Sequence, residues 1–74
     1  MPDETIRWML SKEEGRVVCS QRPSADGIAV HVRYGTLPVA FRQCVAEEEA
    51  RRWADQNRHA WKASGWNDSV AVPG

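Results

Sequence analysis

The fold is decided by residues 28–34, which read IAVHVRY. Branched and aromatic side chains at the even positions alternate with Ala, His and Arg at the odd positions. This period of two is typical of a strand with one buried face. We expect the even-numbered side chains to face a hydrophobic core. The turn sequences on either side, PSADG at 23–27 and GTLP at 35–38, indicate that both neighbouring strands pair with it antiparallel.

Residues 5–11, TIRWMLS, are predicted to form a strand of the same kind. Its inner face carries three large apolar side chains: Ile6, Trp8 and Leu10. Arg7 and Met9 alternate with them and are expected on the outer face. The polar segment KEEG at 12–15 then predicts a hairpin turn into the next strand.

The next strand is predicted over residues 16–22, RVVCSQR, and its register stays open. Either Val17 and Cys19 or Val18 and Ser20 can face the core, because both pairs have a period of two. The pattern indicates a strand without deciding which of its faces is buried.

A fourth strand is predicted over residues 39–43, VAFRQ. Pro38 suits the start of a strand, where no backbone donor is needed for the ladder. Alternation places Val39 and Phe41 inward and Arg42 on the outer face.

From Val45 onward the apolar residues repeat with a period of 3.6, which predicts a helix of roughly 18–20 residues ending at Gly65. Cys44 is expected at its N-cap, with Glu47 three residues later as in a capping box. The inward stripe is Ala50, Trp53, Ala54 and Trp61. We expect Trp53 to be the central plug of the core, because aromatic side chains bury the largest area.

Together these segments predict that residues 1–74 form a single α+β domain. The fold is an antiparallel four-stranded meander with one C-terminal helix packed on one face, and SVAV at 69–72 has the pattern of a short final edge strand. At 8.4 kDa the chain has room for one core only, which excludes a multidomain enzyme or a doubly wound nucleotide-binding fold.

Composition indicates a cytoplasmic protein. The start, MPDE, is acidic and lacks the apolar region of a secretory signal, and no apolar run approaches the roughly 20 residues of a membrane span. Two cysteines, Cys19 and Cys44, are expected to be reduced thiols there. Ten basic and ten acidic residues give zero net charge, which argues against a general binder of polyanions.

The alternation also predicts an arginine-rich surface on the sheet face away from the helix. The candidate binding residues are Arg7, Met9, Arg16, His31, Arg33 and Arg42 on that face, and Trp66 after the helix stop. Arginine binds carboxylates and phosphates in bidentate fashion, and Trp is enriched at interface hot spots. Two simpler interpretations stay open: a merely solvated sheet face, and a Trp66 that folds back onto the helix end.

Motifs for catalysis, nucleotide binding and paired-cysteine metal sites are absent from the sequence, so we expect no enzymatic activity, no cofactor and no metal. Asp55 and His59 have the spacing of an ordinary helical pair. A thiol at Cys44 would gain nucleophilicity from a helix start, but the three glutamates that follow disfavour its thiolate.

The leading hypothesis is a small non-enzymatic protein-binding module, an inhibitor or adaptor of bacterial or phage origin, whose arginines meet an acidic partner. The alternative is a nucleic-acid-binding domain that uses the same arginines. Residues 39–54, VAFRQCVAEEEARRWA, are loosely similar to the strand-to-helix junction of sheet-plus-helix DNA-binding domains of the integrase-arm type, which implies a sheet face in the major groove. A membrane partner is not expected, and the open edges of a meander leave room for a homodimer formed by edge-strand pairing.

Overall fold

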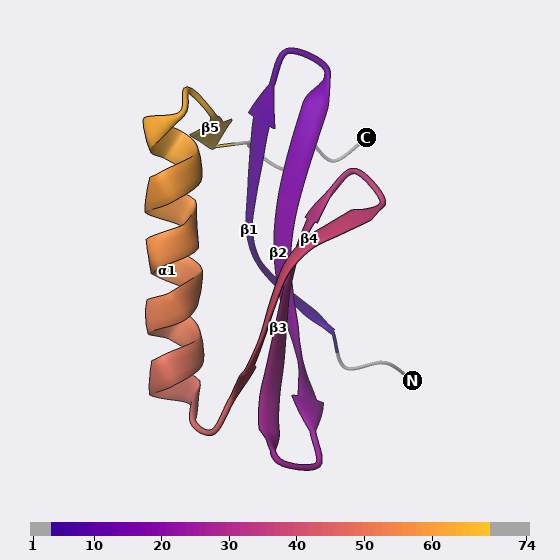
Figure 1. Cartoon of the computed structure of the whole chain (residues 1–74), viewed down its shortest axis with the longest axis vertical. Coiled ribbons are helices and arrows are strands. Elements are labelled where there is room, and N and C mark those ends of the chain that lie inside the picture. Colours follow the sequence, from indigo (N-terminus) through magenta and orange to yellow (C-terminus); the bar gives the residue numbers. More distant parts are fainter. Residues whose placement is uncertain (1–3, 69–74) are drawn as a thin grey trace.

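The computed structural model describes residues 4–68. Its elements are β1 (Thr5–Lys12), β2 (Gly15–Ser24), β3 (Gly27–Tyr34), β4 (Leu37–Cys44), α1 (Glu47–Ala63) and β5 (Asn67–Asp68). The strands pair antiparallel in the order β4-β3-β2-β1-β5, and α1 lies along one face of the sheet (Figure 1). The predicted α+β meander with one C-terminal helix is confirmed.

The turn between β2 and β3 depends on Gly27. Its φ of 140° is disfavoured for residues with a side chain, and a Cβ there would lie 2.1 Å from the carbonyl oxygen of Cys44. The chain between β4 and α1 therefore passes directly against this turn, which fixes where the helix begins.

The core lies between the sheet and α1. Its buried apolar members are Trp8, Leu10, Val17, Cys19, Val30, Val32, Cys44, Ala50, Ala54 and Trp66. Val17 and Cys19 belong to it, which settles the register of β2, and the even-numbered side chains of β3 face the helix as predicted. The small helical residues Ala50 and Ala54 are fully buried and let the helix approach the strands closely.

Trp8 occupies the place expected for Trp53. The Trp8 indole is buried, and its Nε1–H donates a hydrogen bond of 2.9 Å to the carbonyl oxygen of Ala54 on α1. Trp53 is only partly buried and packs against the margin of the core, so the prediction of a central plug at Trp53 is wrong. The Trp8 indole reaches the middle of α1, where Ala54 lies.

A β-bulge in β1 reverses the expected orientation of its first residues. Ile6 pairs with Ser20 and Trp8 pairs with Cys19, so Arg7 is an extra residue in the ladder. Ile6 and Trp8 consequently face opposite sides of the sheet. Ile6 is 53% exposed, and its predicted place in the core is wrong.

A second irregularity shifts β4 by one residue. Val32 pairs with Ala40 but Arg33 pairs with Pro38, which leaves Val39 as the extra residue. Phe41 therefore lies on the face away from α1, where it is exposed, and Val39 is exposed as well. The prediction that Val39 and Phe41 point inward is wrong.

The helix begins two residues later than predicted. Cys44 is the buried last residue of β4 rather than an N-cap, and Ala46 takes the N-cap position without a side-chain hydrogen bond. Glu49 compensates in part, because its carboxylate accepts the backbone N–H of Val45 at 3.1 Å. Gly65, with a φ of 99°, ends the helix in the left-handed conformation as predicted.

Beyond the helix the chain folds back onto the sheet. Trp66 is buried and makes edge-to-face contacts with Trp61 and Tyr34, with ring centroids 5.5 and 5.6 Å apart. Asn67 and Asp68 then pair with β1 as the short strand β5. The final strand predicted over 69–72 lies outside the described residues. Within residues 4–68, α1 is neither long nor apolar enough to cross a membrane.

Candidate functional site

The face of the sheet away from α1, called the open face here, is defined by the strand register. Directly paired residues of antiparallel strands share a face, and successive residues alternate. Its cross-strand rows are Ile6–Ser20–His31–Phe41, Met9–Val18–Arg33–Pro38, Arg22–Ala29–Gln43 and Ser11–Arg16.

Three arginines lie on the open face and are exposed: Arg16 and Arg22 on β2, and Arg33 on β3. Arg33 has a long ion pair of 3.8 Å with Glu4. Within residues 4–68, the guanidinium groups of Arg16 and Arg22 form no ion pair. Among the residues that the structure describes, the guanidinium groups of the open face are thus largely unmatched.

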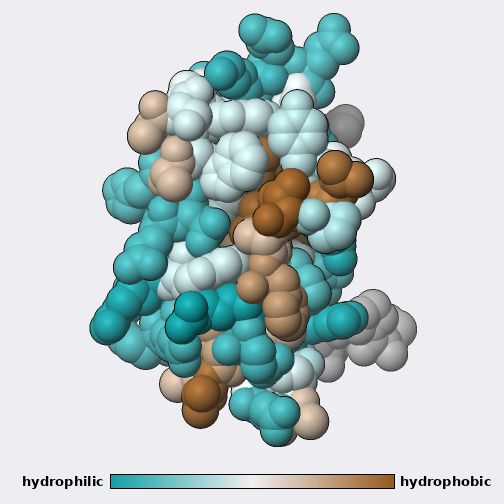
Figure 2. All heavy atoms as spheres, viewed as in Figure 1, coloured by the Kyte–Doolittle hydropathy of each residue, from teal (hydrophilic) through white to brown (hydrophobic). Residues whose placement is uncertain are grey.

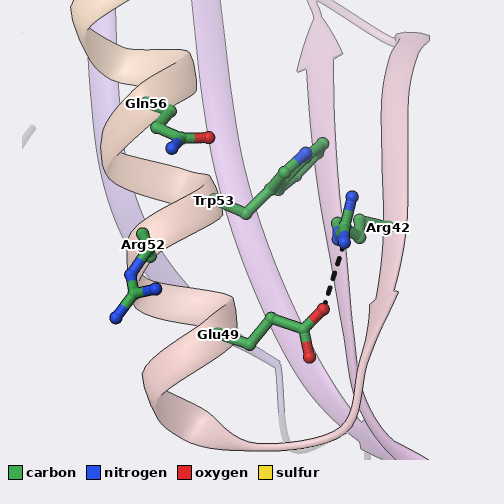
Figure 3. Close-up of a pocket in the computed structure, with 5 residues that line it drawn as sticks. All are labelled: Arg42, Glu49, Arg52, Trp53 and Gln56. Carbon is green, nitrogen blue, oxygen red and sulfur yellow. Dashed lines mark hydrogen bonds and ion pairs between the residues drawn. The ribbon is translucent and has the colours of Figure 1, made fainter.

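Arg7 and Arg42 do not belong to this surface, contrary to the expectation from alternation. The bulge in β1 directs Arg7 toward the helix start, where it contacts Glu47 at 2.9 Å and donates a hydrogen bond to Gln21. Arg42 pairs across the ladder with Val30 on the helix side of the sheet, and it contacts Glu49 at 3.2 Å (Figure 3). Both guanidinium groups connect the first turn of α1 to the sheet.

His31 lies near the centre of the open face, as predicted. Its ring contacts that of Phe41, with centroids 4.9 Å apart in a tilted arrangement. Its Nε2 atom is buried and has no hydrogen-bond partner within the described part of the chain. Burial lowers the pKa of His31, and the positive charges of Arg22 and Arg33 lower it further. The imidazole is therefore neutral at pH 7 and forms an aromatic, uncharged centre between arginines.

Two apolar side chains of the open face could not be identified from the sequence. Phe41 is 57% exposed beside His31, and Ile6 is exposed at the other end of the same row. Alternation assigned both to the core, and only the two strand irregularities bring them outside. Met9, which was predicted on this face, lies there half-buried.

Trp66 is not an exposed anchor. It is buried among Trp61, Tyr34 and Gly15, and a Cβ on Gly15 would lie 3.0 Å from the Trp66 ring. The alternative in which Trp66 folds back onto the helix end is therefore the one that the structure shows.

Besides a pocket of about 390 Å³ between β1 and α1, the helix side has a shallow pocket of about 240 Å³. Arg42, Glu49, Arg52, Trp53 and Gln56 line it, and Figure 3 shows that the Arg42–Glu49 ion pair occupies one end. Because the charges of Arg42 and Glu49 already neutralise each other, this pocket is a weaker candidate for recognition than the open face.

Both cysteine thiols lie in the core, where burial disfavours the thiolate. Burial raises the pKa of the Cys19 thiol to about 12, and burial followed by the charge of Glu49 raises that of Cys44. Both thiols are fully buried and unpaired with each other. In the same part of the chain, no group of three or more His, Cys, Asp or Glu side chains is placed to hold a metal ion.

The open face combines basic and aromatic side chains. Its distinguishing features are the arginines Arg16, Arg22 and Arg33 around the His31–Phe41 pair. Comparison of the chain with protein-family models, with curated proteins and with solved structures gives no match.

Proposed function

We propose that this protein is a small non-enzymatic binding module that engages an acidic surface of a partner protein through its open face. The observation that supports this proposal is that some arginines have a carboxylate partner within the protein and others do not. Those on the helix side, Arg7 and Arg42, have carboxylate partners at 2.9 and 3.2 Å, whereas Arg16 and Arg22 on the open face have none within residues 4–68.

The surroundings of these arginines fit a protein partner. Protein interfaces combine Arg with aromatic side chains at their centres, and charged contacts contribute most where neighbouring apolar groups exclude water. His31 and Phe41 supply such a centre, flanked by Arg22 and Arg33. A partner surface with carboxylates around one or two apolar side chains would match it.

The test is an affinity capture from lysate of the source cells with two variants of equal charge change. Arg22→Glu combined with Arg33→Glu reverses the open face, and Arg51→Glu combined with Arg52→Glu is the matched control on exposed positions of α1. We expect the control to recover the same partners as the wild-type chain and the open-face variant to lose them. Thermal melts of all three proteins verify that each is folded, and equal recovery by both variants would contradict the proposal.

Nucleic acid is the second candidate, because Phe41 is exposed beside His31 on an arginine-bearing sheet. Single-stranded nucleic acids bind such surfaces by stacking bases on aromatic rings and placing phosphates on arginines. Contacts of Arg16, Arg22 and Arg33 with three phosphates predict a slope of about −2 in a log–log plot of affinity against salt concentration. An oligonucleotide titration by fluorescence anisotropy measures it, and no binding at low salt would remove this candidate.

A further inference from the structure

The outer edge of β4 is the most apolar exposed part of the described chain. Its sheet neighbour is β3 on one side only, because β4 stands at the end of the strand order. Leu37 is 64% exposed, Val39 45% and Phe41 57%, and Val45 directly after the strand is 80% exposed. Figure 2 shows hydrophobic atoms gathered on the side of the molecule where β4 lies in Figure 1.

The pairing of Pro23 indicates which backbone groups of β4 point outward. Proline has no N–H, so Pro23 and Ile28 form a non-hydrogen-bonded pair, and the backbone groups of Ile28 face β4 instead. Ile28 pairs with Cys44, and the alternation of the ladder then turns the backbone groups of Phe41 and Gln43 away from the sheet. These donors and acceptors are available to another strand.

Charge does not protect this edge. Exposed edge strands are commonly guarded by charged side chains, especially Lys, that repel a second strand. Arg42 is the only charged residue of β4, and it lies on the helix side in an ion pair with Glu49. The chain as a whole has zero net charge, so two copies have no overall repulsion to overcome.

We propose that β4 pairs antiparallel with β4 of a second copy, on a two-fold axis that passes through Phe41. This register places Phe41 opposite Phe41 of the other copy and Val39 opposite Gln43. The outward-pointing backbone groups of Phe41 in the two copies then meet each other, and those of Gln43 face Val39. The pairing is confined to the residues after Pro38, because the irregularity at Val39 turns the backbone of Pro38 outward and proline has no N–H to donate. A register centred on Arg42 is disfavoured, since it sets two like charges directly opposite each other.

A second copy fits this edge better than a separate peptide strand because the edge is self-complementary. Each copy supplies Phe41 at the two-fold axis, and the resulting aromatic pair adds stability beyond that of the backbone hydrogen bonds. The two-fold axis places the open faces of the two copies on the same side of one continuous sheet.

The first test is the mass of the protein in solution, measured by sedimentation equilibrium at about 100 μM, where an interface with a Kd of about 1 μM is almost fully formed. We expect twice the 8.4 kDa of one chain. Phe41→Lys should give a monomer, because two like charges then meet on the axis. Ile6→Lys is the matched control, since Ile6 is equally exposed on the same face but lies on β1, and it should remain a dimer.

The second test examines the register by disulfide cross-linking. In the proposed pair the Cα atoms of the two Phe41 residues are about 5.5 Å apart, within the range that a disulfide spans. Those of the two Gln43 residues are offset by four residues, about 13 Å. Phe41→Cys should therefore cross-link under mild oxidation, and Gln43→Cys should not, while the buried Cys19 and Cys44 stay unreactive. A monomeric wild-type chain, or preferential cross-linking of Gln43→Cys, overturns the proposal.

Discussion

Replacing Trp8 with Phe should destabilise the protein more than any other conservative exchange of a tryptophan for phenylalanine. The change removes the 2.9 Å hydrogen bond to the carbonyl oxygen of Ala54, which contributes about 1 kcal/mol. It also removes about 50 Å² of buried apolar area, or about 1.3 kcal/mol, because the second ring of the indole adds to the area that a single aromatic ring buries. Incomplete closure of the remaining space adds to this, and we expect a loss of about 2–3 kcal/mol in the free energy of unfolding.

The assay is urea denaturation followed by far-ultraviolet circular dichroism, which does not depend on the tryptophan that is removed. Trp53→Phe is the control, because the Trp53 ring is only partly buried and has no side-chain hydrogen bond among those within residues 4–68. It should cost less than about 1 kcal/mol. A Trp8→Phe protein as stable as the wild type, or a larger loss from Trp53→Phe, would refute this assignment of the core.

The remaining predictions concern a turn, the thiols and acid stability. Gly27→Ala should cost more than about 2 kcal/mol in thermal denaturation, because its Cβ would collide with backbone, whereas Gly35→Ala, with open space around it, should cost about 1 kcal/mol. Cys19 and Cys44 should react with a chromogenic disulfide about 100-fold more slowly in the native protein than in urea, and a native rate equal to that of free cysteine would contradict their burial. Hydrogen bonds lower the pKa of four carboxyls, Glu47 among them, below the values in the unfolded chain. The ionised carboxylates therefore stabilise the folded state above about pH 4. Stability should fall as the pH drops through the lowered values, and a melting temperature that rises on acidification would argue against these contacts.

The order of the elements could be predicted from the sequence because local signals agreed with the global fold. Residues 28–34 alternate without interruption, and β3 is the strand whose inner face was assigned correctly throughout. The change of period after residue 44 predicted α1, and the small residues Ala50 and Ala54 correctly marked its buried stripe. Where no extra residue interrupts the ladder, a period of two is sufficient to assign each side chain to a face.

The candidate site was predicted less well because two strands contain an extra residue. Neither Arg7 nor Val39 has a side chain typical of a bulge, and Pro38 was compatible with an ordinary strand start. Each insertion reverses the alternation beyond it, so Arg7 and Arg42 moved to the helix side while Phe41 moved to the open face. Phe41 adds an exposed aromatic ring beside His31 to that surface.

The contact of Trp66 with Trp61 and Tyr34 has a spectroscopic consequence. Two indoles at nearly right angles, with centroids 5.5 Å apart, are close enough for their electronic transitions to couple. One ring belongs to the last turn of α1, and the other belongs to the segment that returns to the sheet. The coupled signal is therefore present only while these two segments are packed against each other. Circular dichroism of this indole pair therefore reports, without any attached label, whether the segment after α1 is packed on the helix.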